Sequence, residues 1–153
     1  MAILFRTVLV PTDFSDLSKA AIEYAFGVAE RGARIILCHV VDDLPLAYGY
    51  VGAAAAGPEL RTTLAREASA AMDQFAPNPP AGIVIDRQIV HGTPFAAIVD
   101  LARKEAVDLI VMSTHGRTGL KHALIGSVAE RVVRKAPCPV LVVRPKSMVV
   151  GDD

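Results

Sequence analysis

The residues with the clearest potential for chemistry lie in the stretch 108–136, DLIVMSTHGRTGLKHALIGSVAERVVRKA. Its apolar run at 109–112 is typical of a strand, and an amphipathic helix begins at Gly126, with Gly116 and Gly119 in the connection. The first turn of a helix has free backbone N–H groups, and its dipole favours negative charge. A strand that leads through glycines into a helix N-terminus therefore predicts a site for phosphate.

This connection matches neither of the common phosphate-binding fingerprints. The string GxxxxGK[ST] does not occur, and PTDFSD stands after the first strand where GxGxxG would be expected. Turn formation alone would also explain the glycines, and Ser127 with Glu130 forms the pattern of a capping box. Spacing by itself leaves both interpretations open.

Length and charge exclude several classes of protein. The 153 residues suit one domain over 1–153, and 16 basic against 16 acidic side chains argue against a nucleic-acid binder. No run approaches the ~20 apolar residues of a membrane span, and the N-terminus lacks the features of a signal peptide. Cys38 and Cys138 form no CxxC motif, which favours buried thiols rather than a disulfide or zinc site. We expect a cytoplasmic protein without a membrane or nucleic-acid partner.

Apolar runs and helical patterns alternate along the chain. We expect strands at 7–10 (starting as early as Leu4), 34–41, 83–90, 108–112 and 140–143. We expect a first helix that ends near Arg31 with Gly32 as its C-cap, helices over 59–75 and 94–105, and a last helix opened by Gly126 and Ser127. Thr93 and Pro94 suit the N-cap and first position of the third helix. The segment 43–58 is expected to be a flexible loop, and 146–153 a short tail.

This alternation predicts an α/β fold with a single doubly wound, five-stranded parallel sheet and helices on both faces. The natural strand order is 3-2-1-4-5, which is Rossmann-like. In that order the winding reverses between the first and fourth strands, and ligands bind outside their carboxyl ends. The loops at that point are PTDFS and STHGRTG. Polar residues in 83–90 suit an edge strand.

The segment MSTHGRTGLKHALIGSVAERVVRKAPCPVLVV, with VLVPTDFS and CHVVD, closely resembles the universal stress protein family. The nucleotide-binding branch of that family carries G-x2-G-x9-G-[ST]. Gly116, Gly126 and Ser127 match its last three elements, and Ser113 stands in place of the first glycine. The resemblance implies a protein that binds ATP, with Mg²⁺ or Mn²⁺, and acts as a homodimeric sensor or regulatory module in stress response.

The resemblance also implies a site across the switch point. Val40 and Val41 would meet the adenine, and the carboxylate of Asp13 would accept from the ribose or help to hold a nucleotide-bound divalent ion. The cofactor-binding residues it implies are Pro11, Thr12, Asp13, Val40, Val41, Met112, Ser113, His115, Gly116, Arg117, Thr118, Gly119, Gly126, Ser127, Val128 and Ala129.

Simpler roles exist for several of these residues and their neighbours. Asp13 could cap the first helix, and the charges of Arg117, Lys121 and His122 could belong to a solvated surface. A lone loop histidine such as His115 is more often structural than catalytic. His39, within an apolar strand, reads as a core residue with a hydrogen-bond partner, and His91 could reach the site or cap a turn.

The final apolar run predicts an oligomer. Val140, Leu141, Val142 and Val143 would form an edge strand, and an apolar edge invites pairing with a second copy. The family resemblance implies the same dimer, and a regulatory protein partner also fits. One alternative is a dimeric interaction module of this fold that binds no nucleotide. Another is a slow ATPase, for which the sequence offers no evident general base.

Overall fold

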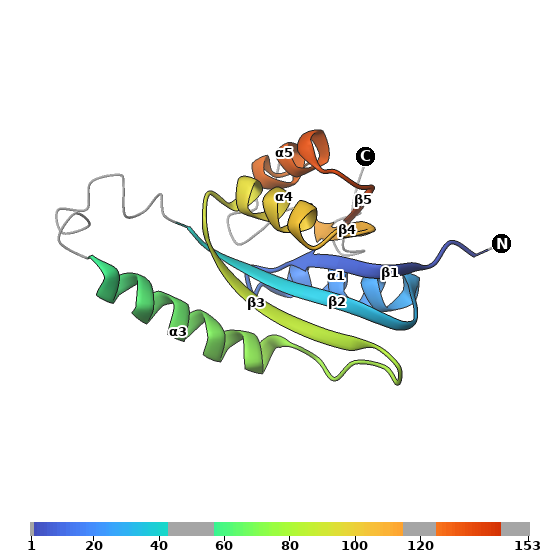
Figure 1. Cartoon of the computed structure of the whole chain (residues 1–153), viewed down its shortest axis with the longest axis horizontal. Coiled ribbons are helices and arrows are strands. Elements are labelled where there is room, and N and C mark those ends of the chain that lie inside the picture. Colours follow the sequence, from blue (N-terminus) through green and yellow to red (C-terminus); the bar gives the residue numbers. More distant parts are fainter. Residues whose placement is uncertain (1, 43–56, 115–124, 145–153) are drawn as a thin grey trace, which may run out of the picture.

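The computed structural model describes residues 2–42, 57–114 and 125–144, in which strands and helices alternate along the chain (Figure 1). The strands are β1 (Phe5–Pro11), β2 (Ala29–Asp42), β3 (Val84–Gly92), β4 (Leu109–Ser113) and β5 (Val140–Val143). The helices are α1 (Asp16–Val28), α3 (Pro58–Phe75), α4 (Pro94–Lys104) and α5 (Ser127–Lys135).

The five strands form one sheet in the order β3-β2-β1-β4-β5, and every neighbouring pair is parallel. The predicted fold and strand order are therefore confirmed. β3 lies at one edge, as its polar residues indicated, and β5 lies at the other. Thr93 is the N-cap of α4 and Pro94 its first residue, also as expected.

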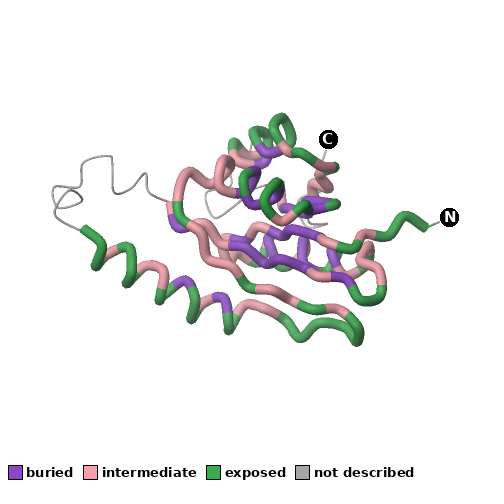
Figure 2. The backbone as a smooth tube through the Cα atoms, in the orientation of Figure 1, coloured by how far each residue is buried: buried purple, intermediate pink, exposed green. Residues whose placement is uncertain are grey.

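Side chains of successive strand residues enter two separate cores, because a strand alternates its side chains between the faces of the sheet. Val8 and Val10 pack with residues of α1 and α3, whereas Leu9 packs with residues of α4 and α5. The helices thus cover the sheet in pairs, and the buried segments of the chain concentrate in the central strands (Figure 2). This double cover explains why β1 and β4 are apolar at consecutive positions.

The end of the first helix differs from the prediction. α1 ends at Val28, and its C-cap Ala29 is already extended and pairs with Phe5 of β1. Gly32 is not the helix cap. It has φ +88° within β2, where the β1–β2 register shifts, and its N–H donates to the Gly82 carbonyl at 2.7 Å. Glycine is required here for an irregularity of the strand rather than for a helix end.

The predicted loop and tail fall mostly outside the described residues. Asp42 still belongs to β2, Gly57 is the N-cap of α3, and 43–56 and 145–153 are not described. In the part of the chain that is described, no helix has the length and apolar character needed to cross a bilayer.

Candidate functional site at the ends of β1, β2 and β4

The parallel sheet brings the ends of its central strands to one edge. β1 is paired with β2 up to Pro11 and Cys38, and with β4 on its other side. β4 runs to Ser113, which pairs with Val143. The predicted site residues on β1, β2 and β4 therefore lie at the same carboxyl edge, where the winding reverses.

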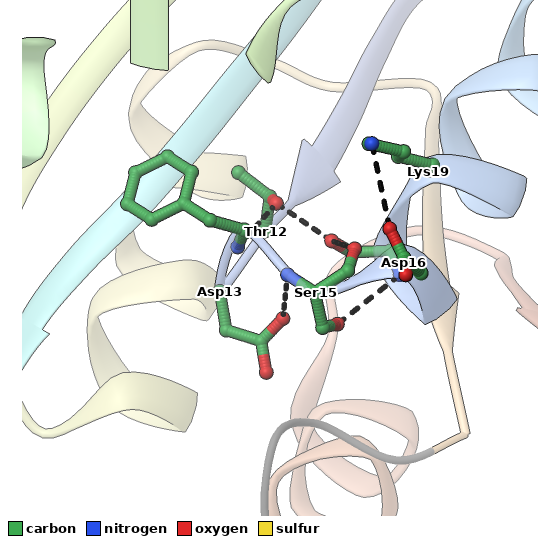
Figure 3. A network of polar contacts seen from close by, with 7 residues as sticks. Thr12, Asp13, Ser15, Asp16 and Lys19 are labelled. Carbon is green, nitrogen blue, oxygen red and sulfur yellow. Dashed lines mark hydrogen bonds and ion pairs between the residues drawn. The ribbon is translucent and has the colours of Figure 1, made fainter. Parts of the chain in front are cut away.

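The residues after β1 form a compact set of hydrogen bonds (Figure 3). The Thr12 hydroxyl accepts from the Phe14 N–H at 3.0 Å and shares a 2.8 Å hydrogen bond with the Ser18 hydroxyl. The Asp13 carboxylate accepts from the Ser15 N–H at 3.0 Å. The contacts of Phe14 with Thr12 and of Ser15 with Asp13 each span two residues, as in Asx and Ser/Thr turns, so local hydrogen bonds within PTDFS help to shape the loop.

Phe14 holds this loop in an uncommon backbone conformation. Its φ is +65°, a left-handed value that costs free energy for a residue with a Cβ. The ring stacks on His39 at a centroid distance of 4.4 Å and meets the edge of Phe75 at 5.7 Å. His39 Nδ1–H donates to the Thr12 carbonyl at 2.8 Å, so this nitrogen carries a proton. His39 thus has the hydrogen-bond partner that its place in an apolar strand indicated.

The N-cap of α1 is Ser15, not Asp13. The Ser15 hydroxyl accepts from the Ser18 N–H at 3.3 Å, whereas Asp13 accepts from Ser15 itself. Asp13 therefore precedes the N-cap of α1 and contributes to the shape of the loop. One carboxylate oxygen is used in that contact, and carboxylate oxygens each have two acceptor positions.

Backbone groups of Val40 point to the space beyond the end of β1. Thr12 donates its N–H to the Cys38 carbonyl at 2.8 Å, which is the last β1–β2 contact of the ladder. In a parallel ladder, alternate residues direct their N–H and C=O groups to the same neighbour. Val40 accordingly directs its N–H and C=O past the end of β1. The N–H and C=O of Val41 point to β3, where Val41 is paired with His91. Of the two predicted adenine contacts, Val40 is the better placed for backbone recognition.

The end of β4 is hydrogen-bonded to the residue that precedes α5. Met112 is buried, Ser113 is half-buried, and Thr114 is only 6 % exposed. Thr114 donates its N–H to the Val143 carbonyl at 3.1 Å, and its own carbonyl accepts from the Gly126 N–H at 2.7 Å. Ser113 has no positive φ, so a serine in place of the motif glycine causes no backbone strain there.

The N-terminus of α5 lacks a capping side chain. Gly126 is the N-cap and Ser127 the first helical residue, so the expected capping box of Ser127 with Glu130 is wrong. Glu130 instead pairs with Arg134 at 2.8 Å. The N–H groups of Ser127, Val128 and Ala129 have no acceptor within the helix, as in the first turn of any α-helix. These N–H groups and the helix dipole are available to an anion.

Several predicted residues lie outside the described part of the chain. These are His115, Gly116, Arg117, Thr118 and Gly119, together with Lys121 and His122. Among the described residues no group of three or more His, Cys, Asp or Glu side chains is arranged to hold a metal ion. His91 is exposed on β3.

Two further features are not among the predicted site residues. Cys38 and Cys138 are free thiols, and burial raises the pKa of Cys38 to about 12 and also raises that of Cys138. A groove of about 420 Å³ between α4 and α5 is lined by Phe95, Ala96, Val99, Asp100, Arg103 and Lys135. None of these lining residues was predicted from the sequence as part of the site.

The fold and the strand ends define the class of protein: a doubly wound α/β domain with polar residues and a helix N-terminus without a capping side chain at its switch point. The model of the universal stress protein family matches residues 4–144, and this chain belongs to that family. It is 40% identical over 147 residues to the universal stress protein MJ0531 of Methanocaldococcus jannaschii, covering 92% of this chain and 83% of that protein.

Two solved structures extend this comparison. The protein MJ0577 of Methanocaldococcus jannaschii superposes with a TM-score of 0.79 at 32% identity, covering 94% of this chain and 99% of that one. A universal stress protein crystallised in complex with cAMP superposes with a TM-score of 0.59 at 26% identity, covering 92% and 98% of the two chains. A cyclic nucleotide is therefore a ligand of one structurally similar member of the family.

Proposed function

We propose that this chain binds ATP at the carboxyl ends of β1, β2 and β4 and acts as a homodimeric sensor or regulatory module. The observation that carries the proposal is the uncapped N-terminus of α5, which Gly126 joins directly to Thr114 at the end of β4. An anion there would receive the N–H groups of the first turn. The nucleotide complex of a similar family member supports the same class of ligand.

The described residues suit the parts of such a ligand. Val40 has its N–H and C=O directed to the space beyond β1, as recognition of a purine edge requires. The carboxylate of Asp13 belongs to a loop whose shape is already set by hydrogen bonds, and it would accept from ribose hydroxyls or contact a divalent ion on the phosphates. Residues 115–119, which the motif assigns to the phosphates, are proposed contacts on the sequence alone.

Ligand identity is tested first by mass spectrometry of the purified protein for co-purifying nucleotide, and then by thermal unfolding with ATP and Mg²⁺ or Mn²⁺. We expect bound ATP or a rise in the melting temperature.

Gly126→Val is the decisive variant, because Gly126 has φ −71° and valine can adopt that backbone. Its side chain should block close approach of phosphate and abolish binding while the fold persists. Unchanged ATP affinity in this variant would show that the site is elsewhere.

The dimer is proposed through β5. Pro139 and Val143 direct their carbonyls to β4, where Ile110 and Thr114 donate to them. By the same alternation Val140 and Val142 direct their backbone groups outward, along the open edge of the sheet. A second copy could add its own β5 there across a twofold axis.

Val142→Pro removes one outward N–H without removing a donor to β4. We expect light scattering to show a monomer and circular dichroism to retain the α/β spectrum. A dimer that persists in this variant would place the interface on another surface. A chain that dimerises but never retains nucleotide would instead fit the interaction module without nucleotide, for which Ser113 at the first motif position is the supporting observation.

A further inference from the structure

Thr114 is buried and has a hydroxyl without a partner. Its side chain is 6 % exposed, and no hydrogen bond to Thr114 Oγ1 is present in the structure as described. It is the buried side-chain polar atom left unsatisfied within the described residues. Buried hydroxyls almost always have a partner, because desolvation without one costs free energy. An unpaired hydroxyl in this position needs an explanation.

The fold directs this side chain to the face that α5 covers. Along β4, Leu109 and Val111 pack with α1, whereas Ile110 and Met112 pack in the core that contains Ala129 of α5. Thr114 continues this alternation, because its N–H still pairs with β5. It therefore lies on the same face as Met112.

The backbone of Thr114 also fixes its distance from the helix N-terminus. Its carbonyl accepts from the N-cap Gly126 at 2.7 Å, so the residue and the first turn of α5 are joined by one hydrogen bond. Two independent features thus meet at one place: a first turn without a capping side chain and a buried hydroxyl without a partner. Both are donors, and both would be satisfied by the same acceptor.

We infer that the Thr114 hydroxyl is a ligand-binding group of this site and donates a hydrogen bond to a phosphate oxygen held at the N-terminus of α5. This inference rests on the proposed nucleotide site and adds to it a residue that the family motif leaves unspecified. Since no hydrogen bond holds Oγ1 in the structure as described, the hydroxyl loses no existing bond when it donates to a ligand.

Thr114→Val tests the inference because valine keeps the shape and removes only the hydroxyl. Without ligand, we expect this variant to melt at the same temperature as the wild type or higher, since it removes an unsatisfied group. With ATP, we expect calorimetric titration to show about tenfold weaker binding, as for loss of a hydrogen bond to a charged oxygen. Thr114→Ser keeps the hydroxyl and should retain most of the ATP affinity.

The matched control is Thr12→Val. Thr12 is also 6 % exposed, but its hydroxyl is bonded to both Phe14 and Ser18. The same substitution should therefore lower the melting temperature of the ligand-free protein. If Thr114→Val lowers it to the same degree, the Thr114 hydroxyl has a structural partner and the inference is wrong.

The outcomes with ligand separate this inference from the proposed function. If the wild type binds ATP and Thr114→Val binds it equally well, the hydroxyl makes no ligand contact, and the proposed function stands without it. If the loss is as large for adenosine as for ATP, the contact is to the nucleoside, which overturns the assignment to phosphate. If the wild type binds neither ATP nor GTP nor inorganic phosphate, both the proposed function and this inference fail.

Discussion

The residues after β1 and those at the end of β4 lie at the same edge of the sheet, yet their polar groups are satisfied in opposite ways. Thr12 and Thr114 are equally buried, at 6 % exposure each. The Thr12 hydroxyl has two hydrogen-bond partners, whereas Thr114 Oγ1 has none in the described structure. The helix after β1 has a serine N-cap whose hydroxyl accepts a backbone N–H, and the helix after β4 begins at a glycine.

In the proposed site, we therefore call the hydrogen-bonded loop after β1 (residues 12–18) the wall, and Thr114 with the first turn of α5 the receptor. The β1 loop satisfies its own groups and keeps its shape without a ligand, so it can hold the Asp13 carboxylate in place. Among the described residues, the end of β4 leaves the Thr114 hydroxyl unpaired and α5 has no capping side chain, and a ligand with acceptor oxygens would pair these donors. Preorganisation on one side and unmet hydrogen bonds on the other together favour binding, because fewer groups must be ordered when the ligand arrives.

The largest expected effect on this comparison comes from Phe14. Phe14→Ala should lower the free energy of unfolding by about 2–4 kcal/mol, since the contacts with His39 and Phe75 are lost. Phe14→Gly should be less damaging than Phe14→Ala by about 1 kcal/mol, because glycine adopts φ +65° without cost. Urea unfolding of both variants measures the order. An alanine variant more stable than the glycine variant would mean that the left-handed backbone carries no strain.

A smaller effect is expected at Ser18, the buried hydroxyl that joins α1 to the loop. It bonds to Thr12 Oγ1 and donates to the Ser15 carbonyl, both at 2.8 Å. Ser18→Ala should therefore cost about 1–3 kcal/mol in the free energy of unfolding. The ATP affinity of the folded variant should change far less than that of Thr114→Val. A larger loss of ATP affinity in Ser18→Ala would break the distinction between wall and receptor.

The smallest effects concern the two helix N-termini. Ser15→Ala should destabilise the protein by about 1 kcal/mol, because α1 loses its N-cap.

Gly126→Ser should stabilise the ligand-free protein by a few tenths of a kcal/mol, since it gives α5 a capping hydroxyl. That hydroxyl would compete for the N–H groups offered to phosphate, so ATP binding should weaken as stability rises. Thermal unfolding and ATP titration of the same sample measure both changes, and tighter ATP binding would contradict the proposed role of the first turn.

The position of the candidate site could be predicted from the sequence, but the roles of the individual residues in it could not. Strand ends, the switch point and the residues of PTDFS could be predicted, because hydrophobic runs and turn residues act locally. Which of Thr12, Asp13 and Ser15 caps α1 could not, since all three are good caps. Ser15 takes the position because Thr12 and Asp13 are used to turn the chain through Phe14.

The two wrong capping assignments, Gly32 at the end of the first helix and Ser127 at the start of the last, have the same origin. Gly32 and Ser127 both carried the expected signal for a helix end, and each such signal is worth about 1 kcal/mol. Pairing of Ala29 with β1 ended the first helix at Val28, and Gly126, whose N–H donates to the Thr114 carbonyl, took the N-cap position of the last helix in place of Ser127. Contacts between distant segments outweighed the local preference in both cases.

The sequence by itself determined the alternation of strands and helices, the parallel sheet and the family, because these depend on periodicity and on motifs that can be read along the chain. Only the tertiary structure decided which polar groups at the switch point are satisfied. A threonine in the sequence is the same donor and acceptor at position 12 as at position 114. Its partners come from residues brought near by the fold, and Thr12 is given two of them while Thr114 is given none in the described chain.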